Sequence, residues 1–473
     1  MNKVLILIII SAMGLFLCSC SPDNKNELPN IILIMADDLG WGDTGFNGND
    51  IISTPALDEL AGQGIIFRRF YSAAPVCSPT RASCLTGRHP YRMGIFGANS
   101  GYLKSQELTL AEILKRKGYT TGHFGKWHLG TLTDTVLDGN RGGRGDTSIY
   151  SPPWENGFDV CFSTESKVPT WNPMITPGKE AGDIGDRIPG SHFGTYYWAG
   201  EGKIVQNNLE GDDSRIIMDR VIPFINKAVN NQTPFLAAIW FHTPHLPVLT
   251  GSEYRQLYSD YSADIQNYYG CISAMDDQIG RLVYTLKSKN VYNNTVIFFT
   301  SDNGPEGTAR QGRTQGSTEG LKGRKRSLYE GGIRVPGFMI WPDKIEGQVS
   351  SEIPVSTSDY YPTILKIAGI NPDDKVEPLD GIDILSLLSS PENIMGKPIG
   401  FISGSQTALI GDRYKLYSSD NGSTYELYDL INDPFEKYDL ISTEKQVATD
   451  MINVLETWID SCVDSNRGKD YHD

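Results

Sequence analysis

The sequence predicts an α/β protein in which helices cover both faces of a large sheet, with a smaller antiparallel sheet near the C-terminus. The main observation is three short and almost continuously apolar segments at 30–36, 234–241 and 295–300. Such runs are typical of strands that are buried on both faces. Stretches with apolar residues at helical spacing lie between them, at 108–117 and 264–288. This alternation of strand and helix indicates the α/β class.

Polar residues follow each of the three predicted strands directly. In chain order they are Asp37 and Asp38, then His242 and His245, then Asp302 and Asn303. In open α/β sheets, ligands bind beyond the carboxyl ends of the strands. We therefore expect these three groups to converge on one site although they are far apart in the sequence.

Residues 136–205 are rich in glycine, proline and aromatic residues and show little periodicity. Such a segment predicts long loops over a site or an insertion into the fold. Four of its aromatic residues, with side chains large enough to stack on sugar rings, are Trp154, Trp171, Tyr196 and Trp198. Local packing is the alternative role of these rings, and it is the commoner one.

The alternation of predicted strands and helices ends at about residue 395. Short strand-like segments follow, at 398–403, 409–418 and 424–430, and a helix is predicted at 447–462. Strands that succeed one another without intervening helices favour an antiparallel sheet. We therefore divide the body of the chain into a catalytic domain at 29–394 and a C-terminal α+β subdomain at 395–473.

The N-terminus resembles a bacterial lipoprotein signal. Lys3 precedes an apolar run at 4–17, which is too short to span a bilayer. The last residue of the run, Leu17, begins the sequence Leu-Cys-Ser-Cys at 17–20. The pattern predicts that residues 1–19 are a signal peptide, that Cys20 becomes a lipid-modified N-terminus, and that residues 20–28 form a tether. The protein would then be exported and fixed to a bacterial membrane in the periplasm or at the cell surface. Ordinary secretory cleavage, which would give a soluble exported protein, is the alternative.

Charge and cysteine content exclude several classes of protein. The 473 residues include 42 Lys and Arg against 57 Asp and Glu, a net charge of -15 that becomes -15 - 1 = -16 once Lys3 is removed with the signal. Such a field repels polyanions and argues against a nucleic-acid-binding protein. An anionic substrate would therefore need a local cationic site. The seven cysteines contain no C-x-x-C pair, which argues against a zinc ribbon or a disulfide framework.

Cys77 stands at a predicted helix start. Pro79 suits a first helical turn and would place Cys77 just ahead of the helix, where free N–H groups and the dipole favour an anion. A buried structural cysteine is the alternative for so short a pattern.

The oxygen-bearing residues after the first and third strands suit a metal. Asp37, Asp38, Asp302 and Asn303 offer hard oxygen ligands, which fit Ca²⁺ or Mg²⁺ and not zinc. Taken singly, such pairs are more often helix caps or tight turns. Two pairs at the ends of two predicted sheet strands favour the metal site.

Five ordered motifs give the chain a resemblance to the formylglycine-dependent type I sulfatases. They are ADDLGWGD at 36–43, CSPTRASCLTGR at 77–88, GKWHLG at 125–130, SDNGPEG at 301–307 and KRSLYEGGIRVP at 325–336. The segment LYDLINDPFEKYDL at 427–440 is similar to the C-terminal part of that family. The resemblance covers most of the chain. It implies an alkaline-phosphatase-like large mixed sheet between helices and a sulfuric ester hydrolase activity.

The resemblance also implies the cofactors. In the family a maturation enzyme oxidises the motif cysteine, here Cys77, to formylglycine (3-oxoalanine). The family binds one Ca²⁺ at the positions of Asp37, Asp38, Asp302 and Asn303, with the formylglycine as a further ligand. The hydrated aldehyde attacks sulfur, and sulfate is then expelled as the aldehyde re-forms. A plain cysteine cannot complete this second half of the reaction.

The resemblance assigns roles to five further residues. Arg81 would fix the modified residue, while Lys126 and His128 would contact it and the sulfate, with His128 taking a proton as sulfate leaves. His245 and Lys325 would bind the sulfate and supply the proton of the leaving alcohol. His242 matches no shared position. Lys322, Arg324 and Arg326 are expected to form a solvated basic loop that could draw in an acidic glycan.

Export favours a sulfatase that acts on extracellular sulfated carbohydrate, such as a glycan or glycosaminoglycan. A phosphoester or phosphonate monoester hydrolase of the same superfamily is the second hypothesis, because some of those enzymes share C-x-P-x-R. A third is a glycan-binding lipoprotein in which Cys77 stays unmodified.

Overall fold

The computed structural model describes residues 28–143, 145, 147–307, 315–371, 378–389 and 397–471. The predicted signal peptide, Cys20, most of the tether and the domain boundary at 394/395 lie outside these ranges. Within them, no helix combines the length and the apolar character needed to cross a bilayer.

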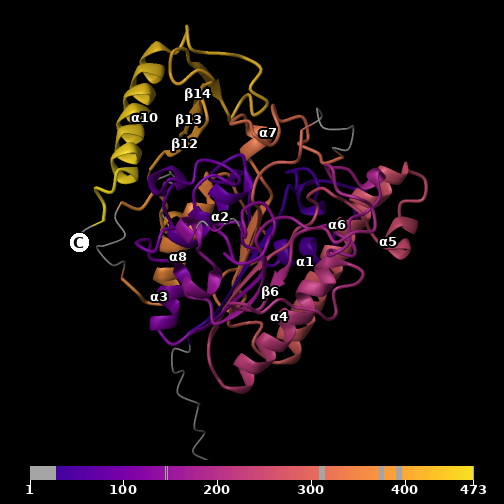
Figure 1. Ribbon diagram of the computed structural model, residues 1–473. Helices are drawn as coiled ribbons and strands as arrows, with labels where there is room; N and C mark the ends of the chain where they lie inside the picture. Colours follow the sequence, from indigo (N-terminus) through magenta and orange to yellow (C-terminus); the bar gives the residue numbers. More distant parts are fainter. Residues whose placement is uncertain are drawn as a thin grey trace, which may run out of the picture.

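A nine-stranded sheet forms the centre of the large domain (Figure 1), with the strand order β10-β2-β9-β8-β1-β7-β4-β5-β6. The three predicted apolar strands are β1 (Asn30–Ala36), β7 (Phe235–Trp240) and β8 (Thr295–Ser301). β1 lies between the other two and pairs in parallel with both. All residues of the three strands are buried, as the continuous apolar runs predict.

The remaining strands make the sheet mixed. They are β2 (Ile65–Phe67), β4 (Thr120–Lys126), β5 (Val160–Thr164), β6 (Tyr197–Trp198), β9 (Gly337–Ile340) and β10 (Val349–Ser351). β9 runs antiparallel to β2 and β8, and β6 runs antiparallel to β5. A separate pair joins β3 (Phe70–Tyr71) to β11 (Val355–Ser356). The predicted fold class is confirmed.

Two of these strands correct the interpretation of residues 136–205, because β5 and β6 complete one edge of the main sheet. Their polar side chains hide the strand pattern and are buried in bonded pairs. For example, His123 Nδ1 of β4 lies 2.7 Å from Ser163 Oγ of β5. β4 is likewise absent from the predicted strands, since its sequence TTGHFGK carries no apolar run.

Alternate side chains of β1 enter two separate cores. Ile31 and Leu33 pack on one face, and Ile32 and Ile34 pack on the other. Each fully buried side chain of this size stabilises the fold by about 1.5–3 kcal/mol relative to its exposed state.

Helices cover both faces of the sheet, as Figure 1 shows. Those on the first face are α2 (Cys77–Thr86), α3 (Leu110–Arg116), α8 (Tyr360–Ile367) and α9 (Ile384–Leu388). Those on the second face are α1 (Pro55–Gly62), α4 (Asp213–Asn230) and α6 (Ala263–Ser288), with the short α5 (Ser252–Gln256) beside α6.

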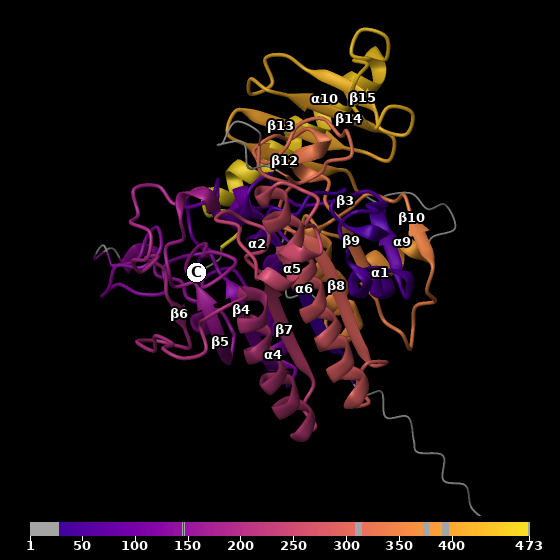
Figure 2. The ribbon, with the colours of Figure 1, turned by 90° about the vertical axis from the view of Figure 1, so that its right-hand side faces the viewer.

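A four-stranded antiparallel sheet lies at the C-terminal end of the chain, at the top of Figure 2. Its strands are β12 (Ile399–Ser403), β13 (Gln406–Ile410), β14 (Tyr414–Ser418) and β15 (Glu426–Asp429). The last helix, α10 (Lys445–Asn466), covers one face of this sheet. The other face packs on Tyr71, Leu328 and Ile333 of the large domain. The short helix α7 (Glu330–Ile333) is therefore held between the two parts.

Candidate active site

The carboxyl ends of β1 and β8 bring the predicted oxygen ligands together. Asp37 and Asp38 follow β1, and Asp302 and Asn303 follow β8. The backbone N–H of Asp38 donates to Asp302 Oδ1 at 3.1 Å, and Asn303 Nδ2 donates to Asp38 Oδ1 at 2.7 Å. Because the two strands are parallel neighbours, residues 264 or more positions apart meet at one sheet edge.

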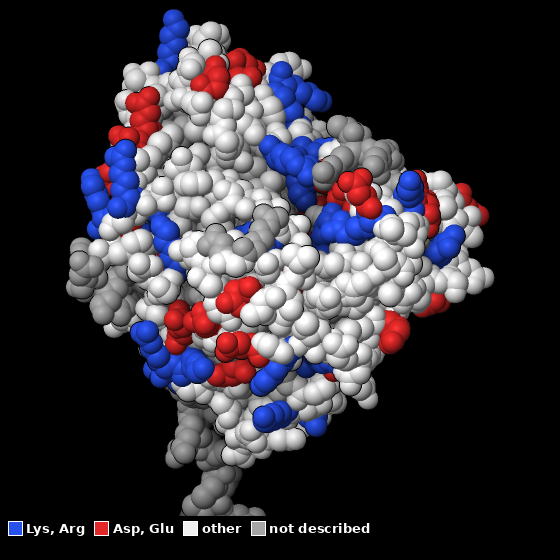
Figure 3. All heavy atoms as spheres, viewed as in Figure 1, with Lys and Arg blue, Asp and Glu red and all other residues white. Residues whose placement is uncertain are grey.

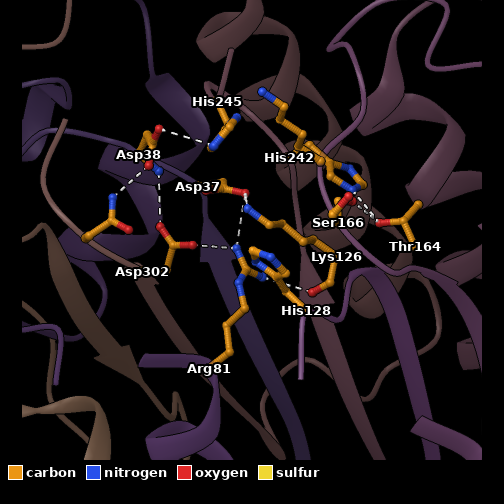
Figure 4. A network of polar contacts seen from close by, with 12 residues as sticks. Asp37, Asp38, Arg81, Lys126, His128, Thr164, Ser166, His242, His245 and Asp302 are labelled. Carbon is orange, nitrogen blue, oxygen red and sulfur yellow. Dashed lines mark hydrogen bonds and ion pairs between the residues drawn. The ribbon is translucent and has the colours of Figure 1, made fainter. Parts of the chain in front are cut away.

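Three cations from other elements surround these carboxylates, and Figure 4 labels two of them, Arg81 and Lys126. Arg81 Nη2, on α2, lies 2.6 Å from Asp302 Oδ2 and 3.3 Å from Asp37 Oδ2. Lys126 Nζ, at the end of β4, lies 2.6 Å from Asp37 Oδ2. Lys325 donates to Asp38 Oδ1. The six charged side chains of this cluster, three acids and three cations, are buried, so their charges interact in a medium that screens them weakly.

The cluster leaves three buried oxygen atoms bare. Among the residues that the structure describes, none donates a hydrogen bond to Asp37 Oδ1, Asp38 Oδ2 or Asn303 Oδ1. Leaving such atoms unpaired is costly unless a cation takes the place of the donors. A Ca²⁺ or Mg²⁺ ion fits this set, because all the available donors are carboxylate or amide oxygens.

Burial and mutual repulsion raise the pKa of two of the acids, while the nearby cations lower the pKa of the third. Burial, with the charge of Asp37, raises the pKa of Asp302 to about 7. Burial also raises the pKa of Asp38, although the Lys325 ammonium opposes the shift. For Asp37, burial is outweighed by Lys126 and the other nearby cations, which hold its pKa well below the usual range.

Cys77 is the first residue of α2 rather than the residue ahead of it, a correction of one position to the predicted helix start. Its Sγ lies within 4.8 Å of ligand oxygens of Asp37 and Asp302. Burial raises the pKa of the thiol, and Lys126 and Lys325 oppose this shift only in part. Arg81 comes one helical turn later and donates from Nη1 to the backbone oxygen of Lys126 at 3.0 Å, which ties α2 to β4.

The end of β4 carries Lys126 into the cluster. Gly125 has a φ of 105°, and a Cβ there would lie 1.9 Å from the backbone oxygen of Trp240. Only glycine therefore lets β4 lie against β7 at this point. His128 also adopts positive φ, at 58°, and its Nε2 lies 2.7 Å from Asn99 Oδ1.

The two histidines after β7 have different surroundings. His245 Nε2 lies 3.7 Å from Asp38 Oδ2, while its Nδ1 lies 2.6 Å from the backbone oxygen of Leu246 and donates to it. Burial and the charge of Lys325 lower the pKa of His245 well below its usual value. His242 is fully buried, and its Nδ1 and Nε2 each lie 2.8 Å from an oxygen, of Asp213 and Thr164 respectively. It is therefore a core residue that supports the end of β5.

The basic loop differs from the expected solvated loop, and one loop aromatic has the packing role, which is the commoner of the two expected from the sequence. Arg326 pairs with Glu306, and Arg324 donates to the backbone oxygens of Glu306 and Gly316, so these side chains are ordered by protein partners. Figure 3 shows basic and acidic side chains close together over the region of α7. Trp198 is buried and donates to Asp138 Oδ2 at 2.7 Å, which assigns it to packing.

Two polar residues near the site were not predicted from the sequence. Asn99 bonds His128. Partial burial lowers the pKa of the half-buried Lys167, and the nearby charges of Lys325 and Lys126 lower it further. Both lie in loops outside the quoted motifs, so only their contacts in space reveal them.

Comparison with known proteins decides the family, because the profile described as Sulfatase matches residues 29–370. The chain belongs to the sulfatase family. It is similar to the N-acetylgalactosamine-6-sulfatase of Mus musculus, with 31% identity over 87% of this chain and 75% of the relative. It is also similar to the steryl-sulfatase of Rattus norvegicus, with 32% identity over 79% of this chain and 72% of the relative. This sulfatase is accordingly a sulfuric ester hydrolase.

Solved structures share the fold of this sulfatase. The crystal structure of Ps i-CgsB in complex with k-i-k-neocarrahexaose is 29% identical, has a TM-score of 0.76, and the match covers 91% of this chain and 92% of that one. The phosphonate monoester hydrolase of Agrobacterium radiobacter has a TM-score of 0.64 at 20% identity, covering 92% and 96%, and shows the fold alone.

Proposed function

We propose that this sulfatase removes sulfate from sulfated carbohydrate with a formylglycine made from Cys77 and a bound Ca²⁺. The observation that carries the proposal is the position of Cys77. Its sulfur lies within 4.8 Å of ligand oxygens of Asp37 and Asp302, in the same cluster as three bare buried oxygens. A metal held there would contact both the side chain at position 77 and an anionic substrate.

The chemistry of the thiol supports a modified residue. A thiolate is the reactive form of cysteine, and burial raises the pKa of Cys77, so the thiol stays protonated near neutral pH. One hydroxyl of a hydrated formylglycine would attack sulfur while the ester S–O bond breaks, with its electron pair leaving on the alcohol oxygen. The second hydroxyl would then lose its proton as the aldehyde carbonyl re-forms, and the C–O bond to sulfate would break with its electron pair leaving on sulfate.

The surrounding residues have the chemistry that such a reaction needs. Asp37, Asp38, Asp302 and Asn303 would hold the Ca²⁺, whose charge lowers the pKa of a bound hydroxyl. Lys126 and Lys325 would neutralise the sulfonyl oxygens. Arg81 holds the carboxylates and α2 in place.

Proton transfer falls to the histidines and Lys325. His245 and Lys325 would donate the proton of the leaving alcohol. The negative charge of a bound sulfate would raise the pKa of His245, so that its imidazole can carry the proton that it donates. His128 would accept the proton that is released as sulfate leaves.

A carbohydrate substrate is supported by the relatives. The mouse relative is named an N-acetylgalactosamine-6-sulfatase, and Ps i-CgsB binds k-i-k-neocarrahexaose. The rat steryl-sulfatase is equally similar in sequence, so the substrate panel must include a sterol sulfate.

Two measurements test the proposal. The mass of the proteolytic peptide containing Cys77 should show the aldehyde, and Cys77→Ala and Cys77→Ser should both abolish turnover in a host that modifies only cysteine. Sulfated mono- and disaccharides should be cleaved faster than sterol sulfate, and aryl sulfate faster than the matched aryl phosphate. An unmodified and fully active Cys77 would refute the nucleophile, and preference for phosphate would favour a phosphoesterase.

The partner proposed for the modification of Cys77 is a formylglycine-generating enzyme. Export and lipid attachment at Cys20 are a separate part of the proposal, with the bacterial membrane as the partner. It is supported by the sequence pattern at residues 1–20. Radiolabelled palmitate should enter the parent protein, and a Cys20→Ala form should leave the membrane fraction. Failure of either result would refute the anchor and leave the sulfatase chemistry untouched.

A further inference from the structure

Two loops meet at the outer side of His128. His128 Nε2 lies 2.7 Å from Asn99 Oδ1, and Asn140 Nδ2 donates to the same oxygen at 2.9 Å. An amide oxygen only accepts hydrogen bonds, so the proton of the neutral imidazole is on Nε2. The donation from Asn140 also fixes which way the Asn99 amide is turned.

The other ring nitrogen is left without a proton. Among the described residues, none bonds His128 Nδ1, although His128 is only 3% exposed. The lone pair of Nδ1 is therefore buried and available. Its surroundings include the charges of Lys126 and Arg81, which belong to the cluster around Asp37 and Asp302. Figure 4 shows His128, Lys126 and Arg81 together.

Both sides of this contact are firmly held. The backbone N–H of Asn140 donates to Glu165 Oε2 at 2.8 Å, and the fully buried Glu165 also accepts from Arg141 Nε at 2.7 Å. On the other side, His128 has a φ of 58°, a conformation that few residues other than glycine adopt and that clusters at functional sites. The orientation of the imidazole thus depends on more than the chain of β4.

We propose that Asn99 is a positioning residue that holds His128 as the Nε2–H tautomer, so that Nδ1 is the atom that accepts the proton when sulfate leaves. The inference rests on the proposed role of His128 in that step. An imidazole without this partner could turn over or place its proton on Nδ1, and in either state it would be a poorer base. Asn99 touches neither substrate nor metal in this account.

The test compares two substitutions that the backbone tolerates. Asn99 has a φ of 70°, so Asn99→Gly removes the amide without adding strain, and Asn99→Asp keeps an oxygen acceptor. We expect Asn99→Gly to lower kcat by roughly 10- to 100-fold, as is typical for the loss of a histidine-orienting partner, with KM nearly unchanged. Asn99→Asp should recover most of kcat. Asn421→Gly, at a φ of 57° in the turn between β14 and β15, is the matched control and should keep full activity.

A spectroscopic measurement reads the tautomer directly. Long-range ¹H–¹⁵N spectra of histidine-labelled protein, expressed without maturation and assigned with His128→Gln, should show Nε2–H in the parent and in Asn99→Asp. Asn99→Gly should show a tautomer mixture. An Nδ1–H ring in the parent, or an unchanged tautomer with full kcat in Asn99→Gly, would overturn the inference.

The activity of His128→Ala distinguishes a failure of the proposed base role of His128 from a failure of the positioning role of Asn99. If His128→Ala kept parental kcat, His128 would not be the base and both proposals about it would fall. If His128→Ala were inactive while Asn99→Gly kept parental kcat and tautomer, only the positioning role of Asn99 would be refuted.

Discussion

Two of the buried charge clusters in the described part of this sulfatase combine carboxylates with cations in different ways. One lies at the ends of β1 and β8, and the other lies between α7 and the C-terminal sheet. In the second cluster, Lys415 Nζ lies 3.0 Å from Glu330 Oε1 and 2.9 Å from Glu436 Oε1. Tyr71 donates to Glu330 Oε2 at 2.9 Å, and the backbone N–H of Glu330 donates to Glu436 Oε2 at 2.8 Å. Every carboxylate oxygen of this cluster therefore lies within 3.0 Å of a donor or a cation, and Glu436 Oε1 is held by the charge of Lys415 without a hydrogen bond of good geometry.

The first cluster, called the catalytic cluster below, also combines buried carboxylates with buried cations, but some of its carboxylate oxygens are unpaired. Its charged members are Asp37, Asp38, Asp302, Arg81, Lys126 and Lys325. Its cations approach only one oxygen of Asp37 and one of Asp38, and the other oxygen of each is bare. Paired oxygens stabilise the contact between two parts of a fold, whereas bare buried oxygens are stable only with a ligand. Bare oxygens favour a ligand site in the first cluster, and paired oxygens favour a structural joint in the second.

Breaking the joint should have the largest effect on stability. Lys415→Met leaves two buried carboxylates without their ammonium, and such a loss costs about 3–5 kcal/mol of the free energy of unfolding. Urea denaturation measures the change. The exposed Lys445→Met is the control and should change little. Adding Glu330→Gln and Glu436→Gln to Lys415→Met should recover most of the loss; if it does not, the cost is one of packing and not of charge.

The catalytic cluster should show a smaller effect on stability that depends on calcium. At a Ca²⁺ concentration ten times Kd, the folded state gains about 1.4 kcal/mol. The parent and Lys415→Met should both show this gain in thermal melts. Asp37→Asn should lose it, and its kcat should fall by about 100-fold or more.

Asp43→Asn is the matched control for Asp37→Asn, because the buried Asp43 has partners at both oxygens: Gly40 N and Tyr268 OH at one, Ser317 N at the other. The variant should keep the calcium-dependent gain. A gain that persists in Asp37→Asn, or that disappears in Asp43→Asn, would contradict the assignment of the bare oxygens as ligands.

The two clusters also differ in how much of them could be predicted from the sequence. Asp37, Asp38, Asp302 and Asn303 follow apolar strands, so the rule that parallel strands end at one sheet edge brings them together. The joint could not be predicted, because Glu330, Lys415 and Glu436 meet only where the C-terminal sheet packs on α7. The same holds for Asn99 and for β4, whose buried polar side chains imitate a loop.

The smallest effect should come from the titration of Glu436. Burial raises the pKa of Glu436 to about 7, above the usual value of 4.5, although Lys415 opposes the shift. A carboxyl group with a raised pKa in the folded state binds its proton more tightly there, so it stabilises the fold at low pH. That stability is lost as the pH rises from about 4.5 through 7.

Glu436→Gln should remove this dependence, since the amide keeps an oxygen acceptor for the N–H of Glu330 and does not ionise. Between pH 6 and 7, the parent should lose about 1 kcal/mol relative to the variant, as judged from urea midpoints. The calcium-dependent gain should be the same in both proteins, because the titrating group lies in the joint. Parallel pH profiles in the two proteins would show that Glu436 keeps one charge state over this range, and the joint would then be a permanent ion pair.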